Sequence, residues 1–414
     1  MRAVLLFTAM VVLYGCSERE RLNPFDPANP LTGGAPSGLQ IVSDRATVTL
    51  SWNPIAVEDL LGYRIFRQCG NSAWVLYDSV AEPTIRFSDS AIEYDTTYRY
   101  CLQAQTSFDL GTVSDTVTII PGPLNIWIAD FYDMAVHRLT YDGRYALGSA
   151  QVTAPIALEY LAAVRRAIVA DYWNRSLLVF DDSLEIQAEI RLDGYPVALA
   201  QDRQNDRFFV LLTGDPGSIV VFSNTGAELQ SFNLLDPVSS WHTLTFDPVT
   251  NAVWLTAGSD QVLAYRLGDS ANPQRWSGIA GVAELEADPI NGGCWVGGDS
   301  VLAMINADNE LSIRRNNFKV YDLSVNPVTG DCYYTGYDRT TGEWETGFFS
   351  AGAETILLGD EYRHLNGIQV LPGIGQQAFV VNQVYSWKLL RFDNQARLIG
   401  EREGVNSRLD YAIE

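Results

Sequence analysis

The 414-residue sequence predicts an all-β protein, in which a small β-sandwich precedes a larger array of repeated four-stranded sheets. Residues 37–122 alternate between apolar and polar side chains with period two, which is typical of strands with one buried face. After Gly122 one apolar pattern recurs at spacings of about 40 residues. The length also predicts two or three domains, at about 100–200 residues per domain.

The charge balance excludes several classes of function. The chain has 28 Lys+Arg and 50 Asp+Glu, so its formal net charge is −22. Nucleic acids and anionic membrane surfaces need a basic patch, so neither is an expected partner. Lys319 and Lys388 are the only lysines, and the chain has three histidines. Schiff-base chemistry and a three-histidine zinc site therefore have few candidate residues.

The first 15 residues have the pattern of an export signal. Arg2 supplies a positive charge, and Ala3 to Leu13 form an apolar run that is too short for a stable transmembrane helix. Leu13-Tyr14-Gly15-Cys16 resembles the lipobox of bacterial lipoproteins. That resemblance implies a signal peptide at 1–15, lipidation of Cys16 and, through Ser17, sorting to the outer membrane. A plain signal peptide or a buried apolar start remains the alternative.

Residues 16–36 are predicted to be a flexible tether, because they contain four prolines, two glycines and few large apolar side chains. The Asn-Pro-Phe-Asp-Pro stretch at 23–27 resembles the segment that follows the lipidated cysteine in many bacterial surface lipoproteins. That resemblance agrees with a spacer role.

Residues 37–122 contain about seven predicted short strands, including 46–52, 62–67, 74–77, 85–87, 97–104 and 112–119. The segment resembles a fibronectin type III domain at Leu-Ser-Trp-Asn-Pro 50–54, Gly-Tyr-Arg-Ile 62–65 and Tyr-Arg-Tyr 98–100. The resemblance implies that Trp52 is the core indole, that Tyr98 lies at a corner before the sixth strand, and that the domain is a spacer.

The repeat fills residues 123–414. Its seven instances are 126–130, 167–171, 208–212, 253–257, 294–298, 332–336 and 378–382, and by subtraction they begin 38 to 46 residues apart. Most follow a strand that ends in Asp-Pro, Asn-Pro or Leu-Pro, and two more strands come after each. Four strands per unit of about 40 residues are typical of a β-propeller blade. The sequence resembles NHL-type propellers and predicts seven blades, with six or eight as alternatives.

The two ends of the repeat array predict how the ring closes. The first instance, at Ile126, has no preceding Asp-Pro strand, and the chain ends in an unassigned strand at 408–413. That strand is expected to complete blade one as its innermost strand.

Aromatic residues recur at one repeat position: Trp127, Phe209, Trp254, Trp295, Tyr333 and Phe379. They are predicted to pack between blades rather than to bind a ligand. Asp130 and Asp171 are predicted to cap turns.

The candidate site is a mouth where the innermost strands start and the second strands end. Aligning the strands places six predicted binding residues there: His242, Glu284, Tyr321, Asp322, Asn366 and Arg408. Tyr132, Trp173, Tyr337, Asp338 and Asn382 are expected beside them. Carboxylates, amides, an imidazole and aromatic rings make a plausible binding surface, and Arg408 could hold a carboxylate or a sugar acid.

No catalytic motif of a hydrolase, metalloprotease or nucleotide-binding enzyme occurs in the sequence. We therefore expect a monomeric, lipid-anchored, non-catalytic binding or scaffolding protein of the cell envelope, without a cofactor. Its expected partner is a glycan, a peptide or an envelope protein. The alternative is a metal-dependent hydrolase that resembles the gluconolactonase group, which implies Ca²⁺ or Zn²⁺ at Glu284, Asp322 and Asn366. A lectin that uses the aromatic rim is a third hypothesis.

The cysteines give two expectations beyond Cys16. Cys69 and Cys101 lie at the ends of neighbouring predicted strands and are expected to form a disulfide in an oxidising compartment. Their side-chain parity does not match, which leaves the free form open. Cys294 and Cys332 share a repeat position in adjacent blades, and are expected to be buried free thiols.

Overall fold

The computed structural model describes residues 23–29, 32–238, 242–372, 377–393, 395–405 and 409–414. Cys16 and Arg408 lie outside these residues. The chain divides into two compact units, Met1–Pro121 and Gly122–Glu414. Every regular element in the described ranges is a strand, and within them no helix has the length and apolarity needed to cross a bilayer.

The first unit contains a three-stranded sheet, β1-β2-β5, and a five-stranded sheet in which β4-β3-β6-β7 are consecutive and β8 also pairs with β6. The strands are β1 (Gln40–Asp44), β2 (Thr47–Ser51), β3 (Leu60–Cys69), β4 (Val75–Ala81), β5 (Arg86–Asp89), β6 (Tyr98–Thr106), β7 (Leu110–Val113) and β8 (Val117–Ile119).

The two sheets share a core at the residues that the sequence singled out. Trp52 is 3% exposed, and its ring centroid lies 5.2 Å from that of Tyr63 in an edge-to-face contact. Tyr98 is buried, and its phenolic oxygen accepts a hydrogen bond from the backbone N–H of Glu93 at 2.8 Å. Asp89 joins the sheets, because its carboxylate accepts hydrogen bonds from Arg67 and Tyr100 at 2.7 Å each.

Residues 23–29 and 32–36 differ from the flexible tether predicted at 16–36. Asn23 Oδ1 accepts the backbone N–H of Phe25, and the Phe25 side chain is only 9% exposed. The carbonyl of Gly34 accepts the N–H of Thr112 at 2.7 Å, so this stretch is attached to the sandwich. The physical reason is that a single aromatic side chain can anchor a proline-rich segment that has no other core.

The predicted disulfide between Cys69 and Cys101 is wrong. Both thiols are free. In the β3–β6 ladder Cys69 lies opposite Tyr98, and Cys101 lies opposite Phe66. A three-residue offset is about 10 Å along a strand, which exceeds the Cα separation of about 7 Å that a disulfide can bridge. Cys294 and Cys332 are free and fully buried, as predicted.

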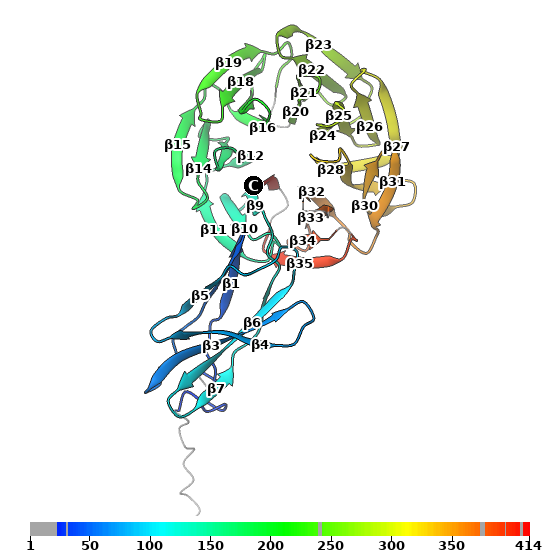
Figure 1. The fold of residues 1–414 in the computed structure, drawn as a ribbon. Coiled ribbons are helices and arrows are strands. Elements are labelled where there is room, and N and C mark those ends of the chain that lie inside the picture. The colour runs from blue at the N-terminus through cyan, green and yellow to red at the C-terminus, as the bar shows by residue number, and fades with distance from the viewer. Residues whose placement is uncertain (1–22, 30–31, 239–241, 373–376, 394, 406–408) are drawn as a thin grey trace, which may run out of the picture. The chain divides into compact units, whose positions relative to one another are not determined.

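The second unit contains seven four-stranded antiparallel sheets within the described residues, and Figure 1 shows them arranged around one axis. The first sheet has the order β11-β10-β9-β36, and each later sheet follows chain order, beginning with β12, β16, β20, β24, β28 and β32. The strand nearest the axis in each sheet contacts its counterparts in the two neighbouring sheets.

The strand bounds in this unit are β9 (Ile126–Asp130), β10 (Ala135–Leu139), β11 (Ala146–Gln151), β12 (Pro155–Leu161), β13 (Arg166–Asp171), β14 (Ser176–Phe180), β15 (Ile186–Arg191), β16 (Pro196–Asp202), β17 (Arg207–Leu212), β18 (Ser218–Ser223), β19 (Glu228–Asn233), β20 (Leu244–Asp247), β21 (Ala252–Ala257), β22 (Gln261–Arg266), β23 (Asp269–Ser277), β24 (Glu284–Ala287), β25 (Gly293–Gly297), β26 (Val301–Asn306), β27 (Leu311–Asn316), β28 (Phe318–Val325), β29 (Cys332–Asp338), β30 (Glu343–Ser350), β31 (Ala353–Leu358), β32 (Leu365–Pro372), β33 (Gln377–Gln383), β34 (Lys388–Phe392), β35 (Leu398–Glu403) and β36 (Leu409–Ile413).

Acidic and amide side chains at strand ends close the turns, as predicted for Asp130 and Asp171. Asp130 Oδ1 accepts the backbone N–H groups of Tyr132 and Asp133, each at 3.0 Å. Asp171 accepts those of Ala154 and Asn174. These bonds satisfy backbone donors that the sheet ladder leaves without partners.

Large side chains pack between successive sheets, so the core of this unit is divided among the interfaces. Trp127 packs with Tyr160 and Val169 of the second sheet, and Trp254 packs with Cys294 of the fifth. The predicted aromatic column is wrong at Phe379, which packs back onto Tyr333 of the sixth sheet. Val380 takes the forward-facing position, packing with the first sheet. The repeat position predicted for Phe379 is therefore taken by Val380, one residue later in the chain.

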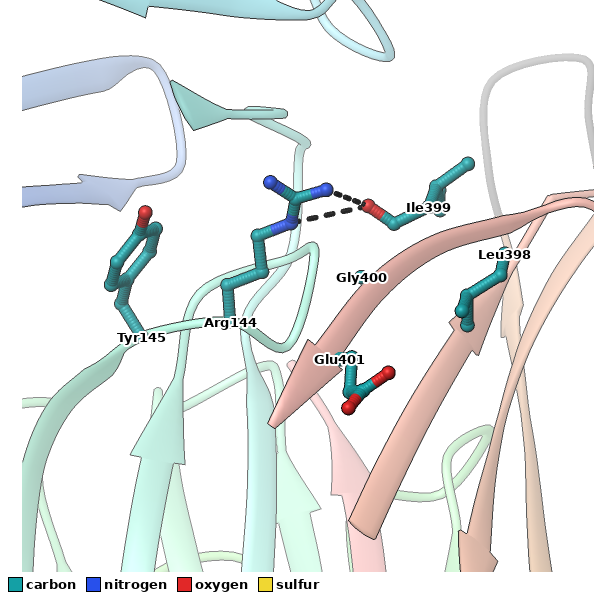
Figure 2. Close-up of a pocket in the computed structure, with 6 residues that line it drawn as sticks. All are labelled: Arg144, Tyr145, Leu398, Ile399, Gly400 and Glu401. Atoms are coloured by element: carbon teal, nitrogen blue, oxygen red, sulfur yellow. Dashed lines mark hydrogen bonds between the residues drawn. The ribbon is translucent and has the colours of Figure 1, made fainter. Parts of the chain in front are cut away.

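The ring closes through both edges of the first sheet. At the inner edge β36 pairs antiparallel with β9, and Tyr411 lies opposite Ile128. In the turn before the outer strand β11, the Arg144 side chain donates two hydrogen bonds to the carbonyl of Ile399 on β35, at 3.2 and 2.5 Å. Figure 2 shows this contact in a shallow pocket of about 320 Å³ lined by Arg144, Tyr145 and residues 398–401.

Gly400 marks the tightest backbone approach in this pocket. A Cβ placed on Gly400 would lie 2.0 Å from the carbonyl oxygen of Asp142, which is rigid turn backbone. We expect Gly400→Ala to lower the free energy of unfolding by about 1–3 kcal/mol, because the seam must separate to admit the methyl group. Urea unfolding would measure the loss. Gly359→Ala is the matched control, since its nearest neighbour is the end of the flexible Glu361 side chain, at 3.1 Å. Equal losses in the two variants would contradict a close-packed seam.

Candidate binding site

A cavity of about 1040 Å³ lies at the axis of the second unit, lined by residues of β12, β16, β20, β24, β28, β32 and β36. Five of the six predicted binding residues lie in its wall: His242, Glu284, Tyr321, Asp322 and Asn366. All five are half-buried. Arg408, the sixth, is outside the described residues. The structure therefore brings together five predicted residues that come from four strands or strand starts.

The strand register arranges polar side chains of the cavity wall in two levels. Asp410, Glu284 and Asp322 share one position, opposite Ala129, Gly297 and Thr335 of the next strand in their own sheets. We call this the upper level.

Two residues farther along the strands lies the lower level, with Glu159, Thr245, Glu286, Ser324 and Gln369. Because successive residues rise by about 3.3 Å, the two levels are about 7 Å apart along the axis.

Side chains of both levels link several of the innermost strands to the next sheet. Asp410 Oδ2 accepts the N–H of Leu158 at 2.6 Å, and Asp322 Oδ2 accepts that of Ile368 at 2.8 Å. In the lower level Thr245 Oγ1 accepts the N–H of Ala287 at 3.2 Å. Innermost strands of different sheets do not form a ladder, so these bonds satisfy their backbone donors.

The carboxylates of the cavity are held in an environment that favours their neutral form. Burial, together with the negative charges of Glu159 and Asp322, raises the pKa of Glu286 to about 8. Burial also raises the pKa of Asp322 to about 7 and that of Asp410 to about 6. Burial and the charge of Asp322 raise the pKa of Glu284 well above its usual value.

Glu159 belongs to the same group on the opposite side of the ring. Burial raises its pKa to about 7, although the guanidinium of Arg203 lowers it. Like-charged groups in a poorly solvated cavity cannot all ionise without repelling one another. Several of these carboxyl groups are therefore protonated near neutral pH. A cation bound in the cavity would favour their ionised form.

Sequence reasoning missed Glu159, Glu286 and Asp410. The predicted binding residues lie only near the starts of the innermost strands, whereas the cavity wall continues along each strand. A carboxylate inside an otherwise apolar strand, such as Glu159 in Ile156-Ala-Leu-Glu-Tyr-Leu161, was the available indication.

Aromatic rings gather at the start of β28 and the turns beside it. Tyr321 stacks on Trp344 at 4.8 Å, and His364 contacts Trp344 at 4.7 Å and Tyr385 at 4.5 Å. Tyr132 and Trp173 are 61% and 58% exposed, in the turns that follow β9 and β13.

Two residues expected beside the mouth are buried instead. Asn382 is 1% exposed. Asp338 pairs with Arg315 at 2.6 Å and caps its own turn, so neither side chain is available to a ligand.

The described residues contain one group of three or more His, Cys, Asp or Glu side chains whose ligand atoms lie within 4.8 Å of one another: Asp130, Asp133 and His137. It lies at the turn between β9 and β10, where Asp130 already caps backbone N–H groups. The described cavity carboxylates do not form such a group. The geometry gives no specific support to the metal-dependent alternative at Glu284 and Asp322.

No protein-family model matches this chain, and no curated protein matches it in sequence. Solved structures do resemble it. A functionally unknown protein from Desulfotomaculum acetoxidans has a TM-score of 0.56 at 11% identity, covering 70% of this chain and 98% of that one. Kuenenia stuttgartiensis hydrazine synthase has a TM-score of 0.52 at 9% identity, covering 66% and 94%. The RRP9 WD40 repeats have a TM-score of 0.47 at 11% identity, covering 61% and 81%.

Identities this low show the fold alone. The radial arrangement of four-stranded antiparallel sheets (Figure 1) identifies the chain as an all-β protein built around a β-propeller.

Proposed function

We propose that this protein is a lipid-anchored binding module of the cell envelope, whose seven-bladed, NHL-like propeller holds a ligand at its axis without chemical turnover. The first unit acts as a fibronectin type III-like spacer. Trp52 in its core and the Tyr98–Glu93 corner bond support that assignment. Cys16 carries the lipid and places the molecule at the outer membrane as a monomer.

The cavity at the propeller axis carries this proposal. It is large enough for a small ligand or a peptide segment, and polar side chains from several sheets converge in its wall. Asp322 and Asp410 already accept two backbone N–H groups each, which suits a fixed binding wall better than a nucleophile or a metal ligand. The partner is a glycan, a peptide or a segment of an envelope protein, and no cofactor is required.

Narrowing the mouth tests the ligand site. Ala283 is exposed and lines the cavity, so Ala283→Trp should obstruct the entrance without altering a carboxylate. Calorimetric titration would use three probes: chitotriose, a galacturonic acid trimer and trilysine. We expect at least one to bind saturably to the parent and not to Ala283→Trp. Ala353→Trp on the outermost strand β31 is the matched control and should bind like the parent.

Two outcomes would refute the proposal. The first is that none of the three probes binds. The second is hydrolysis of a lactone in the presence of Ca²⁺ or Zn²⁺ that is lost on Glu284→Gln with Asp322→Asn, which would favour the gluconolactonase-like alternative. Anchoring is tested separately, because Cys16→Ser should abolish metabolic labelling by a fatty-acid analogue.

A further inference from the structure

The charges of the cavity wall are strongly unbalanced. Its lining includes six carboxylates: Glu159, Glu284, Glu286, Asp322, Asp410 and Glu414. Among the described lining residues the only side chains that can carry positive charge are Arg203 and His242. Glu414 is paired with Arg138 at 2.7 Å, which leaves five carboxylates with only Arg203 and His242 as basic neighbours in the lining.

The hydroxyl of Tyr411 is a second feature that lacks a partner. Tyr411 lines the cavity between Asp410 and the first residues of β32, and it is only 8% exposed. Its phenolic oxygen makes no hydrogen bond to any residue that the structure describes. A buried hydroxyl without a partner is unfavourable, and a ligand with N–H donors would satisfy it.

The spacing of the carboxylates favours an extended cation over a compact metal ion. No three described carboxylate side chains in the cavity lie within 4.8 Å of one another, so a compact divalent ion would lack ligands. The two levels lie about 7 Å apart along the axis. A linear cation with charged nitrogens separated by several carbon atoms can reach both levels, whereas a point charge can reach only one.

We propose that the cavity binds an extended aliphatic cation carrying two or more ammonium groups, seated between the upper carboxylates Glu284, Asp322 and Asp410 and the lower carboxylates Glu159 and Glu286. Its N–H groups donate to these carboxylates and to the Tyr411 oxygen. The inference rests on the proposed function and specifies its ligand class. Free oligoamines and lysine side chains of a peptide share this chemistry.

Protonation of the carboxyl groups in the cavity wall should make cation binding depend on pH. The titratable and charged groups facing the cavity are Glu159 on β12, Arg203 after β16, His242 before β20, Glu284 and Glu286 on β24, Asp322 on β28, and Asp410, Tyr411 and Glu414 at β36. Because their raised pKa values leave several carboxylates partly protonated near pH 7, a bound cation should expel protons. Affinity should therefore rise between pH 6 and pH 8.

The test is calorimetric titration of the full chain with spermidine and with trilysine, in two buffers of different ionisation enthalpy. We expect one-to-one binding with net proton release. The variant Glu284→Gln with Glu286→Gln should weaken it by about tenfold or more, since it removes one charge from each level. Glu228→Gln on the outer strand β19 is the matched control for net charge. Preference for spermidine identifies a free amine as the ligand, and preference for trilysine identifies a basic peptide.

Three results would overturn the inference: no binding of either probe, equal weakening by the Glu228 control, or one-to-one binding of Ca²⁺ that excludes spermidine. Binding of chitotriose that Ala283→Trp abolishes, without spermidine binding, would refute the amine ligand while leaving the proposed function intact. The variant Glu284→Gln with Glu286→Gln should melt no lower than the parent near neutral pH, because burial disfavours the charged form of both carboxyl groups, so loss of folding cannot imitate its loss of binding.

Discussion

Deleting residues 407–414 should abolish cooperative folding of the propeller or lower its stability by about 5 kcal/mol or more. The deletion removes β36 and exposes the backbone edge of β9, with which β36 pairs along its full length. It also uncovers apolar surface, because Tyr411, Ala412 and Ile413 are each 8% exposed or less.

The deletion also removes a buried ion pair, which adds to the loss of stability. The Arg138 and Glu414 side chains are 4% and 2% exposed, and their charged atoms lie 2.7 Å apart. Glu414 Oε1 also accepts a hydrogen bond from the Trp127 indole at 3.1 Å. Removing the carboxylate leaves the guanidinium buried without its anion, which by itself costs about 3–5 kcal/mol.

Differential scanning calorimetry of the full and shortened chains would measure the effect. Glu414→Gln should lose part of the stability, since the amide oxygen can still accept from Trp127. Glu403→Ala, at an exposed side chain near the end of β35, is the control and should melt like the parent. A shortened chain with the parent's melting temperature would show that β36 does not close the ring.

The second large effect is a loss of stability as the pH rises. Glu159, Glu284, Glu286, Asp322 and Asp410 all have pKa values raised by burial. Well below pH 4 these groups are neutral in both the folded and the unfolded chain. Between about pH 4 and pH 8 the unfolded chain ionises first, so the free energy of unfolding falls. We expect the protein to be markedly more stable at pH 5 than at pH 8.

Carboxylates elsewhere act in a separate pH window. Backbone and arginine partners hold the pKa of Asp338 and Asp393 below its usual range despite their partial burial. Their contribution is present above about pH 4 and is lost only as the pH falls further. Stability should therefore pass through a maximum in the mildly acidic range.

Neutralising the lower-level carboxylates should make the free energy of unfolding depend less on pH. Glu159→Gln with Glu286→Gln should raise the free energy of unfolding at pH 8 by about 2 kcal/mol and change it little at pH 5, because a tenfold change in ionisation constant corresponds to about 1.4 kcal/mol. Guanidinium unfolding at both pH values would measure the change. Glu228→Gln, exposed on β19, controls for net charge. A profile equally steep in the double variant would show that these two groups are not its source.

The all-β class, the repeat and the turn caps could be predicted from sequence because each depends on neighbours a few residues away. Period-two alternation identifies a strand without knowledge of its partner, and an Asp such as Asp130 caps a turn within its own segment. The pairing of β36 with β9 was also predictable, because the first repeat lacked one strand and the chain ended with one extra.

The sequence-based predictions are wrong where the position of a side chain depends on a distant part of the chain. Local pattern could not show that Phe25 is buried beside Gly111 of the sandwich. Nor could it show that a three-residue offset separates Cys69 from Cys101 in their ladder, or that Val380 rather than Phe379 faces the first sheet. In each case a shift of one strand against another changes which side chains meet.

The sequence by itself determined the strands, their grouping into repeats and five of the residues in the cavity wall, since these follow from local periodicity and repeat position. Only the tertiary structure decided that Glu159, Glu286 and Asp410 join Glu284 and Asp322 around one cavity. Their pKa values are raised because closing the ring removes water and sets like charges near one another, and neither effect exists in any single repeat.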